Sequence, residues 1–193
     1  MKRFYCSLLI LVLNLHGNIG TYGFVQFKNH YFVETGTFRG DAVARALKEG
    51  FQEVYSIEFF DILVKSAKKR FENFKNVTII HGDSKNALWD IIKDLDKPIT
   101  FWLDAHIYPP HEGIVNCPLI QELEQIKKHP IKTHTILIDD LSCCDTLAFD
   151  YLSLHDLINK IKEINFDYVF ELLAGGDNDE VKNNVLCARI PAK

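Results

Sequence analysis

The chain has 193 residues, a length and composition that suit one globular domain rather than a disordered segment. Lys and Arg total 22 against 26 Asp and Glu, a net charge of −4, so we expect no basic surface that would hold a phosphate backbone. The charge therefore argues against nucleic acid as a partner. The five cysteines form no CxxC pair and their number is odd, which indicates mostly reduced thiols.

The N-terminal segment has the pattern of a targeting sequence. Lys2 and Arg3 precede the apolar run FYCSLLILVLNL, which has the length of a signal peptide and is short for a membrane span. No clean small-x-small cleavage site follows it. We interpret residues 1–25 as a signal peptide or a retained N-terminal anchor, and residues 26–193 as the folded domain. The protein would then be secreted or membrane-associated, with the anchor as its membrane contact; otherwise it would be cytoplasmic.

From residue 31 onward, short apolar runs alternate with segments of helical periodicity, a pattern typical of a parallel sheet covered on both faces. The predicted strands are 31–35, 53–58, 77–83, 99–105, 134–140, 167–173 and 184–190. Apolar residues three and four apart predict crossover helices between the first six strands, and the last two should form an antiparallel hairpin. The predicted fold class is α/β: a doubly wound, seven-stranded, mostly parallel sheet with an antiparallel C-terminal β-hairpin.

The predicted strands end in polar residues that suit ligand binding, because open α/β sheets bind ligands beyond the carboxyl ends of their strands. The first strand runs into ETGTFRG, where Gly36 and Gly40 allow a tight turn close to a ligand. The second ends in Glu58, 22 residues after Gly36, where a carboxylate can accept hydrogen bonds from both hydroxyls of a ribose. The alternative is that Glu58 caps a helix or is a solvated loop acid.

Together, VETGTFRG, YSIE, IIHGDS, FWLDAH and the closing hairpin resemble the class I S-adenosylmethionine-dependent methyltransferases over residues 31–190. The resemblance implies a Rossmann-like sheet with S-adenosylmethionine as the cofactor. It places the methionine part over the first turn, the ribose on Glu58 and the adenine near the end of the third strand. The expected cofactor-binding residues are Glu34, Thr35, Gly36, Thr37, Gly40, Glu58, Asp83 and Ser84. One residue departs from the family pattern: Phe38 stands where the turn usually has a glycine.

Three further acids, Asp104, Asp139 and Asp140, follow the fourth and fifth strands. If these strands are neighbours, the carboxylates converge and repel one another unless a cation lies among them. Oxygen ligands suit Mg²⁺. The arrangement resembles the metal-dependent O-methyltransferases of the catechol and macrolide-sugar type, and this resemblance implies that all three acids bind Mg²⁺. The alternative is that Asp139 and Asp140 cap the following helix.

His106 lies two residues beyond Asp104 and has an ordinary pKa suited to a general base. Mg²⁺ would lower the pKa of a substrate hydroxyl, and His106 would then accept its proton. In the catechol enzymes a lysine serves near this point, but DAHIY contains none, so the assignment rests on proximity. A loop histidine and a metal ligand are the alternatives. The expected catalytic residues are therefore Asp104 and His106.

The sequence favours an S-adenosylmethionine-dependent, Mg²⁺-assisted O-methyltransferase acting on a small hydroxylated molecule, for example a sugar. A metal-dependent phosphoester hydrolase is an alternative, because DAH, GD and DD also supply carboxylate and imidazole ligands. A non-catalytic binding module with the same fold is a second alternative. The sequence leaves the methyl acceptor and the oligomeric state open.

Overall fold

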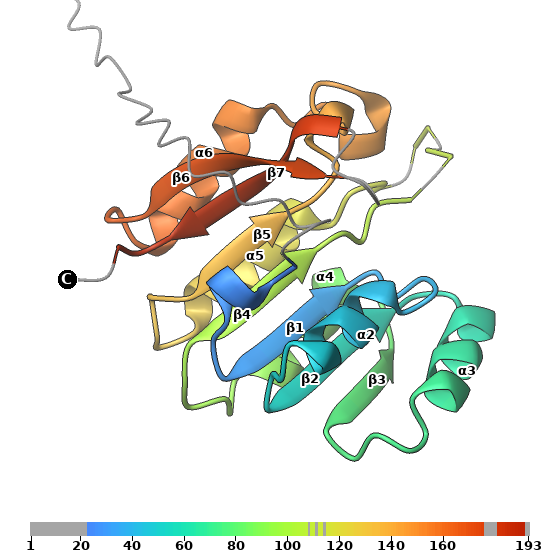
Figure 1. Ribbon diagram of the computed structural model, residues 1–193. Coiled ribbons are helices and arrows are strands. Elements are labelled where there is room, and N and C mark those ends of the chain that lie inside the picture. The colour runs from blue at the N-terminus through green and yellow to red at the C-terminus, as the bar shows by residue number, and fades with distance from the viewer. Residues whose placement is uncertain (1–22, 108, 111, 114, 176–180, 192–193) are drawn as a thin grey trace, which may run out of the picture.

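The computed structural model describes residues 23–107, 109–110, 112–113, 115–175 and 181–191 (Figure 1). Residues 1–22, most of the segment expected to be a signal peptide or anchor, lie outside these ranges. Within the described part of the chain, no helix is both long and apolar enough to cross a membrane.

The described residues form one sheet of seven strands in the order β3-β2-β1-β4-β5-β7-β6. The strands are β1 (Tyr31–Thr35), β2 (Glu53–Glu58), β3 (Val77–His81), β4 (Ile99–Leu103), β5 (Thr135–Ile138), β6 (Val169–Gly175) and β7 (Val181–Arg189). The pairs among β1 to β5 are parallel, whereas β7 is antiparallel to both β5 and β6. The predicted fold class is confirmed: β7 lies between β5 and β6, which makes β6 the edge strand.

A helix follows each of the first five strands, which confirms the predicted crossovers. The helices are α2 (Asp41–Lys48), α3 (Asp61–Arg70), α4 (Ser84–Ile92), α5 (Leu119–Lys128) and α6 (Leu154–Ile164). Three short 3₁₀ helices are η1 (Val25–Phe27), η2 (Leu141–Cys143) and η3 (Leu147–Phe149). Local sequence fixes where α6 begins, because Ser153 and Asp156 form a reciprocal capping box.

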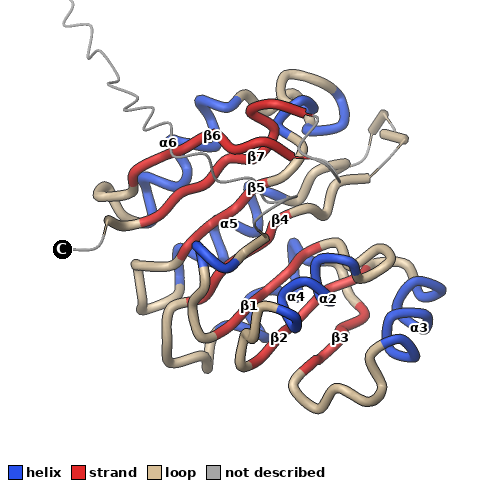
Figure 2. The backbone as a smooth tube through the Cα atoms, in the orientation of Figure 1, coloured by secondary structure: helices blue, strands red, loops and turns tan. Residues whose placement is uncertain are grey.

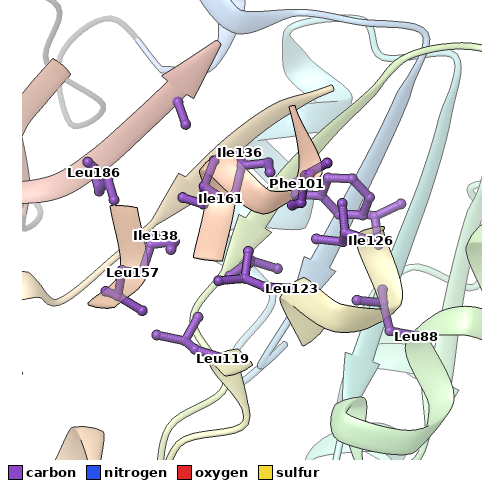
Figure 3. Packing of buried hydrophobic residues seen from close by; sticks show 14 of the residues in the cluster. Leu88, Phe101, Leu119, Leu123, Ile126, Ile136, Ile138, Leu157, Ile161 and Leu186 are labelled. Atoms are coloured by element: carbon purple, nitrogen blue, oxygen red, sulfur yellow. The ribbon is translucent and has the colours of Figure 1, made fainter. Parts of the chain in front are cut away.

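The sheet separates two hydrophobic cores, since successive side chains of a strand point to opposite faces. In β4, Phe101 and Leu103 belong to the larger core with α4, α5 and α6, whereas Trp102 faces the core that includes α2 and α3. Figure 3 shows Phe101, Leu123 and Ile161 meeting in the larger core. In Figure 2, α2 crosses in front of the strands and α5 lies behind them. A sheet covered on both faces leaves the ends of its strands as the place for a site.

Packing of the domain extends to Phe24, two residues before the expected domain start at residue 26. Phe24 is 1% exposed, and its ring centroid lies 4.8 Å from that of Phe32 and 5.2 Å from that of Trp102. Phe27 is also buried. The described body of the domain therefore includes this short aromatic segment in front of β1.

Strands β3, β4 and β5 each end two residues earlier than predicted, which moves the acids at their ends into loops. The first loop residues still donate to the neighbouring strand: Asp104 N–H to Thr35 O at 3.1 Å, and Asp139 N–H to Leu103 O at 3.2 Å. Beyond these bonds the chain leaves the sheet. The side-chain alternation of the strand therefore no longer dictates where the acids point.

Candidate functional site

A cavity of about 810 Å³ opens at the carboxyl ends of the parallel strands, within the usual size range of small-molecule sites. The loops that follow β1, β2, β3, β4 and β5 all contribute to its wall. Among the predicted site residues, those on the wall are Gly36, Glu58, Asp83, Ser84, Asp104, His106 and Asp140. The sheet thus brings together residues that are more than 100 positions apart in the sequence.

The turn after β1 needs glycine at position 36 for two reasons. Its φ is +85°, and a Cβ atom there would lie 2.4 Å from the carbonyl oxygen of Asp104. The turn therefore sits directly against the loop after β4. Gly40 also has a positive φ, but a Cβ atom there would meet the ring of Phe71 at 2.6 Å, so Gly40 packs against the end of α3 and is not part of the cavity wall.

Glu58 joins the first two loops of the cavity. Its Oε2 accepts the N–H of Phe38 and its Oε1 accepts the N–H of Phe60, both at 2.8 Å. Because each carboxylate oxygen has two lone pairs, both can still accept a hydrogen bond from a ligand hydroxyl. Glu58 is 4% exposed and the N-cap of α3 is Phe60, so neither the solvated-acid nor the N-cap alternative describes it.

Three predicted cofactor residues, Glu34, Thr35 and Thr37, are buried beside the cavity and do not form its wall. Ser56 donates a hydrogen bond of 2.5 Å to Glu34 Oε2, and its hydroxyl lies 2.5 Å from that of Thr37. Burial raises the pKa of Glu34 to about 8 against the effect of the Ser56 hydrogen bond, and the charge of Glu58 adds to the increase. These hydrogen bonds support the turn after β1 on the side that faces away from the cavity.

Asp83 and Ser84 lie on the cavity wall at the start of α4. Asp83 is the N-cap residue: its Oδ1 accepts the N–H of Lys85 at 3.2 Å, and its Oδ2 pairs with Lys85 Nζ at 2.8 Å. Ser84 is 4% exposed. A contact of either residue with an adenine stays a prediction.

Asp104, His106 and Asp140 form a group of three possible metal ligands on the same wall, with donor atoms all within 4.8 Å of one another. His106 Nδ1 lies 3.7 Å from Asp104 Oδ1, and its Nε2 lies 3.5 Å from Asp140 Oδ2. These distances are too long for good hydrogen bonds. The two distances involve different ring nitrogens, and one imidazole offers only one of them to an ion, so a shared ion would use either Nδ1 or Nε2 together with the two carboxylates.

The protonation equilibria of this group are shifted by burial. Burial raises the pKa of Asp104 well above its usual range, and the charges of Asp139 and Asp140 add to the increase. Burial also raises the pKa of Asp139 to about 7, again with Asp140 as the next cause. Burial lowers the pKa of His106, although the charge of Asp140 acts in the opposite direction. A bound cation would stabilise the ionised carboxylates and leave the imidazole neutral.

Asp139, the third predicted metal ligand, is not part of this group. Its Oδ1 accepts the N–H of Asp140 at 2.8 Å and lies near Gly175 in β6, where a Cβ atom would be 3.3 Å away. Asp140 is the N-cap residue of η2 but makes no side-chain cap bond; its Oδ1 instead accepts Asn184 Nδ2 at 3.0 Å. Of the two adjacent acids, Asp140 therefore faces the cavity.

The sequence did not predict the role of Asp150, which holds the part of the cavity wall formed by the loop before α5. The carboxylate of Asp150 accepts the backbone N–H groups of Asn116 at 2.9 Å and Cys117 at 3.0 Å, and Asn116 Nδ2 at 3.1 Å. Asn116 lies on the wall. The residues are 34 positions apart and carry no common motif, so no local signal could have paired them.

Two exposed aromatic residues on the wall, Phe59 and Phe60, were also missed. Their rings lie edge to face with centroids 5.3 Å apart. Here the sequence did hold a signal, because an aromatic pair directly after a predicted ligand-binding acid occupies the start of a cavity loop.

No family model and no curated protein sequence matches the chain. Solved protein structures, in contrast, do match the fold of the chain. The O-methyltransferase from Bacillus cereus in complex with S-adenosylhomocysteine superposes with a TM-score of 0.60 at 14% identity, covering 87% of this chain and 77% of that one. The O-methyltransferase TomG from Streptomyces achromogenes, in complex with S-adenosylmethionine, gives 0.60 at 12% identity, with coverages of 88% and 76%. An rRNA methylase from Streptococcus thermophilus gives 0.58 at 11% identity, with coverages of 87% and 92%.

The chain therefore has the Rossmann-like fold of class I S-adenosylmethionine-dependent methyltransferases. At these identities the likeness establishes the fold, and one fold can carry many activities. Its neighbours include an enzyme named for RNA, so the fold does not separate small-molecule from nucleic-acid acceptors.

Proposed function

We propose that the protein transfers a methyl group from S-adenosylmethionine to a hydroxyl of a small molecule, with a divalent cation in the site. One observation carries the proposal: a single cavity has a buried ribose-type carboxylate, Glu58, in its wall together with the Asp104, His106 and Asp140 group. The first feature suits a nucleoside cofactor and the second suits activation of an acceptor hydroxyl.

The turn after β1 and the carboxylate after β2 fit the cofactor. Gly36 keeps its side of the cavity free of a side chain, and Glu58 keeps lone pairs for the ribose hydroxyls. S-adenosylmethionine supplies an electrophilic methyl group on its sulfonium. The protein's task is then to hold the acceptor oxygen in line with that methyl group and to remove its proton.

The donor set fits a divalent cation. Asp104 and Asp140 would hold Mg²⁺, whose charge lowers the pKa of a bound hydroxyl, and burial keeps His106 neutral and able to accept the proton. If His106 were itself a ligand, its nitrogen would favour Mn²⁺ over Mg²⁺. Comparing methyl transfer in Mg²⁺ and in Mn²⁺ therefore distinguishes His106 as a base from His106 as a metal ligand.

We propose a small hydroxylated acceptor, sugars included. The acceptor end of the cavity combines the polar groups of His106 and Asn116 with the apolar side chains of Ile107 and Val115. A few polar groups among apolar contacts is the usual composition of a small-molecule site. Asp150 would preserve this end by holding Asn116 in place.

The test is calorimetric titration of the purified full chain with S-adenosylmethionine and S-adenosylhomocysteine. We expect one nucleoside site, and we expect Glu58→Gln to weaken binding about tenfold or more, because a charged acceptor of the ribose hydroxyls is lost. Glu72→Gln, at an exposed acid outside the cavity wall, is the matched control. If the wild-type chain binds neither nucleoside, the proposal is wrong.

A second measurement addresses the metal. Transfer of a labelled methyl group to a panel of diols and sugars is compared in Mg²⁺, in Mn²⁺ and in EDTA. We expect activity with Mg²⁺ and its loss in EDTA. Equal rates with and without EDTA would rule out the metal while leaving the methyl-transfer proposal intact.

A further inference from the structure

The backbone of Phe38 adopts a conformation that does not suit its side chain. Its φ is +46°, between two glycines with φ of +85° and +81°. In the left-handed region the Cβ atom of an L-residue is crowded, and a bulky residue there is a true outlier. Glycine at position 38 would adopt this turn without strain. The phenylalanine therefore needs a compensating interaction.

Packing within the protein does not supply that compensation. The Phe38 side chain is 59% exposed and lies on the cavity wall. Its clearest partner is the guanidinium of Arg39, 5.2 Å from the ring centroid, and an exposed contact of this kind is weak. The ring thus presents apolar surface to the cavity at the expense of backbone strain.

Glu58 fixes the backbone of Phe38. The hydrogen bond from Phe38 N–H to Glu58 Oε2 holds the strained residue next to the carboxylate proposed to bind the ribose. The other oxygen of Glu58 holds Phe60, which with Phe59 is also half exposed on the same wall. Three exposed aromatic residues therefore lie on the same cavity wall as the buried carboxylate of Glu58.

We infer that the ring of Phe38 packs against the nucleoside part of the bound cofactor and covers it from solvent. The inference rests on the proposed function and deepens it. Tyr151 has a similar positive φ away from the cavity, so strain alone does not mark a site; Phe38 differs because its exposed side chain lies on the cavity wall and its backbone is bonded to the proposed ribose carboxylate. Phe38 would then be a cofactor-binding residue at the position where the resemblance leads one to expect a glycine.

The test measures both melting temperature and affinity for S-adenosylhomocysteine in Phe38→Gly. We expect the variant to melt no lower than the wild type, because glycine removes the strain. We expect its affinity to fall roughly 5- to 10-fold, as the loss of one partly buried aromatic contact would produce. Circular dichroism verifies that the variant is folded.

Tyr151→Gly is the matched control, because Tyr151 also has a positive φ of +60°, is 67% exposed and is not on the cavity wall. We expect it to bind S-adenosylhomocysteine as the wild type does. If Phe38→Gly binds as tightly as the wild type or more tightly, or if it melts several degrees lower, the inference is overturned. Absence of binding in the wild type itself would instead overturn the proposed function.

Discussion

The two ends of the parallel strands both bury polar side chains, and at the amino-terminal end a network of neutral side chains is hydrogen-bonded within the protein. Asn29 Nδ2 is placed to donate to Ile99 O at 3.1 Å and to the hydroxyls of Thr100 and Thr135, each at 3.2 Å. Tyr168 O–H donates to the carbonyl oxygen of His134 at 2.9 Å. These bonds tie the strand beginnings to one another.

A pair of buried histidines completes the amino-terminal network. Ile99 N–H donates to His134 Nδ1 at 3.1 Å, which leaves the proton of His134 on Nε2, 3.1 Å from His129 Nδ1. His129 Nε2 can then donate to Leu95 O at 3.0 Å. Burial lowers the pKa of His134 to about 3, with His129 and Lys132 adding to the decrease. The His134 ring is therefore neutral, and the ring nitrogens of both histidines have hydrogen-bond partners within the protein.

The carboxyl-terminal end is different, because it buries several acids close to one another, and not all of their oxygens have partners within the protein. Burial raises the pKa values of Glu34, Asp104, Asp139 and Glu122. Neither carboxylate oxygen of Glu122 has a hydrogen-bond partner among the described residues. Buried acids that repel one another destabilise a fold unless a ligand compensates them. The difference between the ends indicates that one is built for stability and the other for binding.

The largest expected effect is that of Asp104→Asn on methyl transfer. If Asp104 holds the cation, transfer should fall at least about 100-fold, a typical loss when one general acid–base or electrostatic contribution is removed. Stability should not fall, because one of several repelling carboxylates is gone. The rate of methyl transfer from labelled cofactor measures the first effect, and the melting temperature measures the second. Asp90→Asn, at an exposed acid paired with Lys93, is the control; a rate within twofold of wild type would make Asp104 a structural acid.

The next largest effect is that of His134→Ala on stability. Removing the ring leaves a cavity and an unpaired buried Ile99 N–H, so the free energy of unfolding should fall by about 2–4 kcal/mol at pH 8, as measured in urea. Because the native pKa is low, the unfolded state binds more protons below the ordinary value of 6.5. Wild-type His134 therefore contributes stability that is lost as pH falls from 6.5 toward 3. The deficit of the variant should shrink at pH 4.5.

Two controls accompany this variant. His155→Ala, at an exposed position, should leave stability unchanged. Affinity for S-adenosylhomocysteine should be unchanged in folded His134→Ala, because the ring lies at the other end of the strands. A marked loss of affinity would contradict the division of roles between the two ends.

The smallest expected effect is a gain of about 1–2 kcal/mol in the free energy of unfolding of Glu122→Gln at pH 8. Burial raises the pKa of Glu122 to about 7 from 4.5; the nearby hydroxyls of Ser84 and Thr35 act in the opposite direction, although they do not reach hydrogen-bond geometry with its carboxylate. The native state therefore binds more protons between these values, and stability falls as pH rises through 4.5 to 7. The gain should nearly vanish at pH 4.5. The wild-type contributions have opposite pH dependence: stability from His134 is lost as pH falls, and stability from Glu122 is lost as pH rises.

Glu124→Gln is the matched control on the same helix, because Glu124 is partly exposed and pairs with Lys160. Its stability should change little at either pH. If Glu122→Gln is destabilised at pH 8, Glu122 has a partner that stabilises its charge, and it would belong with the satisfied groups of the amino-terminal end.

The sequence by itself determined the fold and the content of the site. Its apolar periodicities predicted seven strands with helical crossovers, because burial on both faces requires them. It also placed Gly36, Glu58, Asp83 and Asp104 at strand ends, and these residues do meet at one cavity, since parallel strands bring their carboxyl ends to the same edge.

Only the tertiary structure decided which of the predicted side chains face that cavity. Asp140 faces it whereas Asp139 turns toward β6, and Glu34 lies behind the turn, because the loop geometry beyond a strand end is set by contacts with distant segments. Asp150 and His134 act through partners 34 and 35 positions away. Such pairings carry no periodicity, since the separation between two residues in a sequence does not determine their distance once the chain has folded.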